Sequence, residues 1–198
     1  MICIEKAIFQ GANASKILHQ CTTRSGSSYI TEPQISVMLN RQGRVLALVR
    51  VTALNPEAYY IEYPAPLSAL IKEHLDPFLR LSRVRAEWRI SQIFEEPSPQ
   101  LVVPWIVNPI HSGLWTAFDL SCDLLGYIDF QKGCYLGQEI VARIYAKDQI
   151  SHKKRLGIWT GSVDKVQDAC LYSYHHGSVL AVLSKDLWHL QEAERVIC

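Results

Sequence analysis

One short stretch carries most of the chemistry that the sequence offers. Residues 132–139 read Lys-Gly-Cys-Tyr-Leu-Gly-Gln-Glu, so Cys134 stands between two glycines and follows Lys132 by two positions. A nearby positive charge or a helix N-terminus lowers the pKa of a thiol, and the thiolate is the reactive form. Lys132 brings the charge, and a helix expected to begin near Gln138 would direct free amides at the loop. The stretch therefore predicts a reactive thiol, with Cys134 and Lys132 as its catalytic pair.

The neighbours of Cys134 favour a small-molecule pocket. Gly133 and Gly137 carry no side chains, so the backbone could come close to a ligand there. Gln138 and Glu139 could hydrogen-bond the edge of a planar heterocycle. Tyr135 could form a wall of the pocket or simply pack. For an isolated cysteine between glycines the plainer interpretation, a small buried residue in an ordinary turn, is the commoner one.

Other residues allow weaker predictions. Trp105 and Trp115 could stack on a planar ring of a ligand, and they could equally be core tryptophans. His175 and His176 could ligate a metal, but no third ligand follows at a suitable spacing, so we predict no metal site. No C-x-x-C, no phosphate-binding G-x-x-x-x-G-K and no recognisable Ser/His/Asp set occurs.

Composition excludes several classes of protein. The 198 residues are 48% hydrophobic and 20% charged, which is typical of a globular chain with a real core. A net charge of +1 disfavours a dedicated nucleic-acid binder, although the basic bend Lys153-Lys154-Arg155 could contact an anion. No apolar run approaches the roughly 20 residues of a membrane span, and no secretory signal is evident at the start. The six scattered cysteines indicate reduced thiols and a cytoplasmic location.

Hydrophobic periodicity predicts an α+β protein. We expect strands over 4–9, 34–40, 44–54, 58–63 and 82–93, and helices over 14–20 and 64–81. Asn13 is the expected N-cap of the first helix, and Pro77 should kink or end the second. The strand, strand, helix, strand order near 41–94 favours a helix packed on an antiparallel sheet.

The second half of the chain is more irregular. Glu95 to Pro99 marks a compositional boundary, and the prolines and glycine of 102–113 indicate a loop. One helical turn is expected over 120–125 and a helix over 138–147, where Glu139 and Arg143 are spaced for an ion pair. Strands are expected over 156–159 and 178–183, and the ambiguous tail 187–197 favours a strand.

Residues 132–143, KGCYLGQEIVAR, resemble the hallmark motif of the YgfZ family, folate-binding relatives of the glycine-cleavage T-protein. The resemblance extends through the approach to the motif at 125–131, Pro104-Trp105-Ile106, the turn at 39–45 and Lys154-Arg155-Leu156. Two positions depart from the family pattern: Arg24 replaces an acidic residue and Gln42 replaces a lysine. Either change could weaken folate binding.

The resemblance implies an α+β, T-protein-like architecture. Residues 1–150 would form the folate-binding domain, with a ferredoxin-like module inserted at about 41–94, and residues 151–198 a shortened C-terminal β-barrel. It also places Cys134 and Lys132 at functionally sensitive positions. Ligand-binding roles are implied for Gly133, Tyr135, Gly137, Gln138, Glu139, Arg143 and Trp105.

The implied function is binding of tetrahydrofolate or a derivative, in support of the assembly or repair of iron–sulfur enzymes, including those that thiolate tRNA. Partners would be iron–sulfur client enzymes or assembly proteins, and any cluster would be held only transiently. Such a protein is an accessory factor more than a conventional enzyme. Two alternatives stay open: a folate-dependent aminomethyl or one-carbon transferase, and a thiol-based cluster scaffold that needs no folate.

Overall fold

The computed structural model describes residues 2–25, 32–95, 102–147 and 154–196. Four sequence predictions fall partly outside these ranges. They are the boundary at residues 95–99, the start of the basic bend at Lys153, the division between the two predicted domains at 150 and 151, and the last residue of the tail 187–197.

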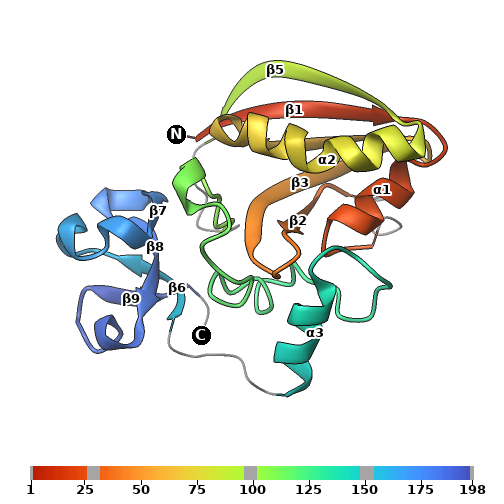
Figure 1. Cartoon of the computed structure of the whole chain (residues 1–198). Helices are drawn as coiled ribbons and strands as arrows, with labels where there is room; N and C mark the ends of the chain where they lie inside the picture. The colour runs from red at the N-terminus through yellow and green to blue at the C-terminus, as the bar shows by residue number, and fades with distance from the viewer. Residues whose placement is uncertain (1, 26–31, 96–101, 148–153, 197–198) are drawn as a thin grey trace.

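A five-stranded antiparallel sheet forms the larger part of the molecule (Figure 1). Its spatial order is β2-β3-β4-β1-β5. Each strand lies within a few residues of its predicted position, because buried or half-buried apolar side chains recur along the segments. The strands are β1 (Ile2–Gln10), β2 (Gln34–Leu39), β3 (Val45–Asn55), β4 (Ala58–Pro64) and β5 (Arg85–Glu95).

Strand β1 joins what the sequence presented as a separate module. It pairs antiparallel with both β4 and β5, and so fills the place between them. The strands of 41–94 therefore share one sheet with β1 and β2 instead of forming a sheet of their own. If β2 is set aside as an edge strand, the chain runs β-α-β-β-α-β, the ferredoxin-like connection order. This unit begins at β1, not near residue 41.

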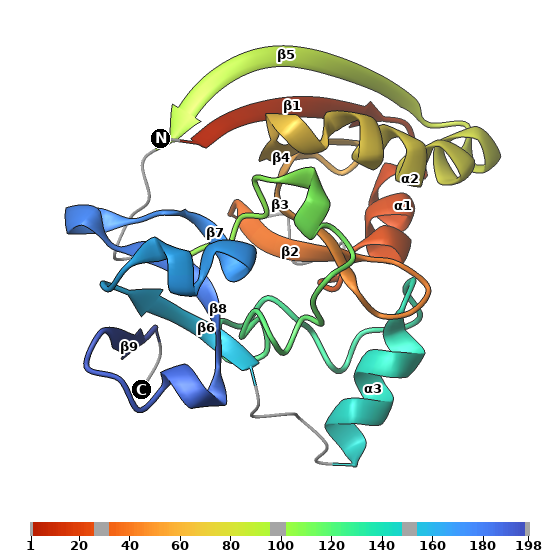
Figure 2. The same ribbon diagram turned by 60° about the vertical axis from the view of Figure 1, so that its left-hand side comes forward.

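Two helices lie side by side along this sheet (Figures 1 and 2). Helix α1 (Ala14–Cys21) buries Ile17 and Leu18, as expected. Asn13 does not cap it; the Asn13 amide instead donates to the Ser82 carbonyl at the end of α2, 3.1 Å away, and so ties the two helices together.

Helix α2 (Ser68–Ser82) follows the short 3₁₀ turn η2 (Ala65–Leu67) and runs on past Pro77. We expected Pro77 to kink or end this helix, and the second of these outcomes is wrong, because α2 continues to Ser82. Pro77 lies on the exposed side, while Ile71 and Leu75 anchor the opposite side in the core. Core contacts thus carry the helix past a residue that removes one backbone donor. No helix in the described part of the chain is long and apolar enough to cross a membrane.

The C-terminal part is a second antiparallel sheet, of order β7-β8-β6-β9 (Figure 2). Its strands are β6 (Lys154–Trp159), β7 (Cys170–Ser173), β8 (Val179–Ser184) and β9 (Ala193–Arg195). The tail is thus a 3₁₀ turn, η7 (Lys185–Leu187), followed by one short strand. Within the described residues β7 and β9 are the outer strands, so a closed barrel stays a prediction.

A long irregular segment, residues 102–137, connects the two sheets, and α3 (Gln138–Ala146) follows it. Between 120 and 125 the chain forms turns instead of the expected helical turn. The segment is well anchored. The Tyr172 hydroxyl of β7 donates to the Val103 carbonyl at 2.6 Å, and side chains from both sheets share one hydrophobic core.

Candidate functional site

The thiol loop, residues 129–137, lies against the C-terminal end of α1. Its anchor is Lys132, whose side chain is buried. The ammonium donates to three backbone carbonyls, those of His19 at 2.6 Å, Thr22 at 2.6 Å and Arg24 at 2.9 Å. The last carbonyls of a helix lack partners within the helix, and a cation there is favoured by the helix dipole. Lys132 therefore caps α1 from across the sequence.

Backbone bonds flank this contact on both sides. The Leu136 amide donates to the Gln20 carbonyl at 3.0 Å, and the Asp129 amide donates to the Thr23 carbonyl at 3.0 Å. The loop is therefore held along its length by the carbonyls that α1 and the residues after it leave open.

Helix α3 holds the loop from its other side. The Phe130 ring stacks on Tyr145 of α3, with centroids 3.9 Å apart. Gln138, the first residue of α3, donates from its side-chain amide to the Lys132 carbonyl at 3.4 Å.

Burial dominates the electrostatics around Lys132. It lowers the pKa of Lys132 to about 8, although Asp129 and Cys21 act in the opposite direction. Burial also raises the pKa of the Cys21 thiol to about 12 and that of the Tyr135 hydroxyl to about 12. The Tyr135 ring lies under the ammonium, 4.8 Å from Nζ to the ring centroid.

The sequence predicts that the Lys132 ammonium acts on the Cys134 thiol, but in the structure the ammonium is bonded to backbone carbonyls. An ammonium has three N–H donors, and all three point to carbonyl oxygens. Cys134 is exposed on the loop. The structure thus shows a lysine bound to backbone next to an accessible thiol.

The second glycine of the motif makes room for the protein's own backbone. Gly137 has a φ of +81°, and a Cβ there would lie 2.6 Å from the Asn40 carbonyl oxygen. On the other side of this crossing Gly43 has a φ of +71°, and its Cβ would lie 2.8 Å from Cβ of Ile140. The start of α3 and the turn between β2 and β3 can approach this closely only because both positions are glycine. At Gly133 a Cβ would make an ordinary 3.5 Å contact with the His19 ring.

The remaining predicted ligand contacts lie apart from one another. Glu139 and Arg143 form the expected ion pair at 2.6 Å on the exposed face of α3. Trp105 is buried beneath the Arg50 guanidinium, 5.9 Å from it, and Trp115 is buried against His111. The core interpretation of both tryptophans therefore fits the structure better than a stacking platform.

The basic bend is only partly a surface feature. Arg155 is largely buried and donates to the Asp123 carboxylate at 2.9 Å and to the Phe118 carbonyl at 2.8 Å, which fastens β6 to the connecting segment. Lys154 is exposed. His176 lies exposed in a turn, and the described residues contain no group of three side chains suited to a metal ion.

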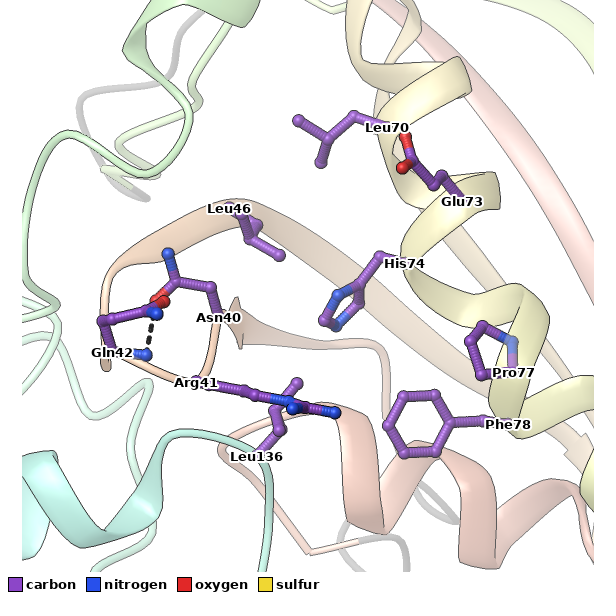
Figure 3. A pocket seen from close by; sticks show the side chains of 10 residues that line it. All are labelled: Asn40, Arg41, Gln42, Leu46, Leu70, Glu73, His74, Pro77, Phe78 and Leu136. Carbon is purple, nitrogen blue, oxygen red and sulfur yellow. Dashed lines mark hydrogen bonds between the residues drawn. The ribbon is translucent and has the colours of Figure 1, made fainter.

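A cavity of about 500 Å³ opens beside the thiol loop (Figure 3). One wall is the β2–β3 turn, residues 40–44, and the opposite wall is helix α2. Leu136 of the thiol loop lines it too, so two segments that the sequence singled out, 39–45 and 132–139, meet here. The complete lining is Asn40, Arg41, Gln42, Leu46, Leu70, Glu73, His74, Pro77, Phe78 and Leu136.

The polar groups of this pocket are few and varied. In Figure 3 the Arg41 side chain extends from the turn toward Phe78, and the His74 ring projects from α2 into the space. Nε2 of His74 is buried without a hydrogen-bond partner among the described residues, and burial lowers the pKa of this imidazole. The Asn40 side chain is fixed, because its Oδ1 accepts from the amides of Gln42 at 3.0 Å and Arg44 at 2.9 Å. A cation, a carboxylate, a neutral imidazole and amides thus surround an apolar floor.

Sequence reasoning missed the helix wall of this pocket. Leu70, Glu73, His74, Pro77 and Phe78 follow i, i+3, i+4, i+7, i+8 spacing, which places them on one face of α2. The available signal was the pair of polar residues within that face. On a helix face that packs entirely against the core, a histidine and a glutamate would be unusual.

Comparisons with known proteins agree with the motif. No family model matches the chain. The tRNA-modifying protein YgfZ of Escherichia coli strain SMS-3-5 is 29% identical over 112 residues, which are 56% of this chain and 33% of that protein. The tRNA-modifying protein YgfZ of Blochmanniella pennsylvanica is 32% identical over 112 residues, 55% of this chain and 32% of that protein. The matches span about a third of the length of these curated relatives.

The fold comparison reaches further along the chain. The crystal structure of the glycine cleavage system aminomethyltransferase T from Bartonella henselae superposes with a TM-score of 0.62, at 10% identity, over 80% of this chain and 65% of that one. The chain therefore has a mixed α/β fold like that of the T-protein. It is a distant, partial relative of proteins named YgfZ, and together these likenesses support the YgfZ/T-protein family.

Proposed function

We propose that this protein binds tetrahydrofolate or a derivative and thereby supports the assembly or repair of iron–sulfur enzymes, including enzymes that thiolate tRNA. The observation that carries the proposal is the meeting of Leu136, from the YgfZ-like motif, with the turn at 40–44 in one cavity. The partial likeness to YgfZ proteins and the T-protein fold support it.

The chemistry of the cavity suits a reduced folate. Its volume of about 500 Å³ is within the usual range for a small-molecule site. The amide groups of Asn40 and Gln42, with the Glu73 carboxylate, offer donors and acceptors for a pterin edge. Arg41 offers a bidentate partner for the glutamate carboxylates of the ligand. Because Gln42 replaces the family lysine, the neighbouring Arg41 is the cation that this turn contributes to the pocket lining.

Binding is tested by isothermal titration calorimetry with 5-formyltetrahydrofolate. Arg41→Ala should weaken binding about tenfold, because a charge-assisted contact is lost. The matched control is Arg143→Ala, which removes an exposed arginine that does not line the pocket. No heat with the wild-type protein, or equal affinities for the two variants, would refute the placement of folate in this cavity.

The iron–sulfur role is tested in a bacterial strain that lacks its own relative. Expression of this chain should restore thiolated tRNA nucleosides, measured by mass spectrometry. Cys134→Ser should abolish the restoration, because its thiol is exposed to a client protein. Cys3→Ser replaces a partly buried thiol of β1 and serves as the control. Failure of the wild-type chain, or equal restoration by both variants, would count against this role.

Two other functions each have one supporting observation. The T-protein fold favours a folate-dependent aminomethyl transferase, although the cysteine of the motif is not expected in that branch. Turnover of an aminomethyl donor with tetrahydrofolate would establish it. The exposed Cys134 favours a cluster scaffold, which would need a dimer or a thiol co-ligand. Anaerobic reconstitution without cluster absorbance, in the wild type as in Cys134→Ser, would remove it.

A further inference from the structure

We propose that Lys132 is a positioning residue, which locks the thiol loop onto the end of α1 and so sets the places of Cys134 and Leu136, and that it does not exchange a proton with the thiol. This assignment rests on the proposed function only in treating the loop as part of the site. Its test uses no folate, so its failure and the failure of folate binding are distinguishable.

The first argument is the saturation of the ammonium. Its three donors meet three carbonyl oxygens within 2.9 Å, from His19, Thr22 and Arg24. The residue is 7% exposed, and the Tyr135 ring covers the ammonium from the loop side. A group that delivers a proton to a thiol must be able to turn toward it, and turning would break three charge-assisted hydrogen bonds to carbonyls that are buried or partly buried.

The second argument is the position of the contact along the loop. Lys132 lies between the two backbone bonds that join the loop to this region, Asp129 to Thr23 and Leu136 to Gln20. Two residues of the loop have candidate functional positions: Cys134 is exposed to solvent, and Leu136 lines the pocket. One buried contact beside them therefore determines where both stand.

The titratable groups around the ammonium belong to both partners of the contact. From α1 they are His19 and Cys21, and from the loop they are Asp129 and Tyr135. Asp129 acts on Lys132 from the loop side, and Cys21 acts on it from the helix.

Hydrogen–deuterium exchange on the ligand-free protein measures how firmly Lys132 holds the thiol loop against the end of α1. In Lys132→Met the amides of Asp129 and Leu136 should exchange about tenfold faster, while β3 amides stay protected. Arg155→Met is the matched control, because it also removes a largely buried cation bonded to a carbonyl, and its partners Phe118 and Asp123 lie outside residues 129–137. It should leave both loop amides unchanged. Unchanged exchange in Lys132→Met, or equal acceleration in Arg155→Met, would overturn the proposal.

A second readout separates positioning from proton exchange. The rate of Cys134 alkylation by iodoacetamide is followed against pH by mass spectrometry. If Lys132 only positions the loop, Lys132→Arg keeps the wild-type midpoint of this profile, since it retains a cation with several donors. If Lys132 exchanges a proton with the thiol, arginine cannot replace it and the midpoint moves, which would overturn the proposal. This comparison decides the matter even if Lys132→Met fails to fold.

Discussion

The thiol loop and the neighbouring pocket differ in how completely their polar groups are paired. In the loop, the ammonium of Lys132 has a carbonyl for every donor, and backbone amides on either side are bonded to the same region. In the pocket, the buried Nε2 of His74 has no partner among the described residues. The stretch with the most distinctive sequence thus has its polar groups paired with backbone groups at the end of α1. The pocket with the unpartnered imidazole nitrogen is formed by a turn that the sequence singled out and by a helix face that it did not.

This difference shows that a distinctive motif need not mark a ligand-binding site alone. It can also be required where two backbone segments pack in close contact. Of the two glycines around Cys134, Gly137 is required by contact with the β2–β3 turn. That turn is itself a wall of the pocket. The motif therefore supports the pocket wall, because Gly137 packs against the turn that lines the pocket. The Cys134 thiol is exposed and is not part of the pocket lining.

The strongest test of the crossing is Gly137→Ala. We expect a loss of about 3 kcal/mol in the free energy of unfolding, from a strained φ of +81° and a Cβ that would lie 2.6 Å from a carbonyl oxygen. Gly126→Ala is the control: its φ is +72° but nothing lies within 4 Å of the added atom, so about 1 kcal/mol is expected. Urea denaturation measures both. Equal losses would show that the crossing is looser than described.

Lys132→Met should cost about 2 kcal/mol at pH 7, because three buried or partly buried carbonyls lose their hydrogen bond from the ammonium. The pKa of Lys132 falls from 10.5 when unfolded to about 8 in the folded protein, so between these values the unfolded chain binds more protons. Wild-type stability should therefore rise relative to the variant by about 1 kcal/mol per pH unit from pH 8 to 10.5. Only the difference between the two proteins is informative, because burial of the Cys21 thiol acts with the opposite sign above pH 9. A constant difference would show that the ammonium is not desolvated.

His74→Leu should separate the pocket from the fold. Removing an unpartnered buried nitrogen should leave stability at pH 7 unchanged or raise it by up to about 1 kcal/mol. Burial lowers the pKa of His74, so part of the wild-type stability is lost as pH falls below 6.5, and the variant should lose less. Folate affinity should fall in the same variant. Unfolding curves from pH 5 to 8 and calorimetry test the two halves, and a marked loss of stability would mean that His74 is a structural residue.

Glu139→Gln should have the smallest effect. The pair with Arg143 is exposed on α3 and stabilises the helix by no more than about 0.5 kcal/mol. Folate affinity should not change, because neither residue lines the pocket. A tenfold weaker affinity in calorimetry would restore the ligand-binding role that the sequence implied for this pair and would move the site onto α3.

Local patterns predicted much of the fold. Helix α1 and the strands of the first sheet follow their predicted ranges closely, because their apolar spacing also decides which side chains are buried. The errors occurred where a distant segment intervened. Core contacts carry α2 past Pro77, and Asn13 bonds to the end of α2 instead of capping α1. The candidate site follows the same rule: the thiol loop was recognised, and the helix face opposite it was not.

The sequence by itself determined most elements of the first sheet, the exposed ion pair of α3 and the motif that carries Cys134, since each depends on spacing within a few residues. Only the tertiary structure decided that β1 lies between β4 and β5, that Lys132 caps a helix more than a hundred residues earlier in the chain, and that Leu136 lines a pocket with α2. The physical reason is that a buried hydrogen-bond donor must pair with an acceptor that the tertiary fold places nearby. The spacing of residues along the sequence does not identify that acceptor.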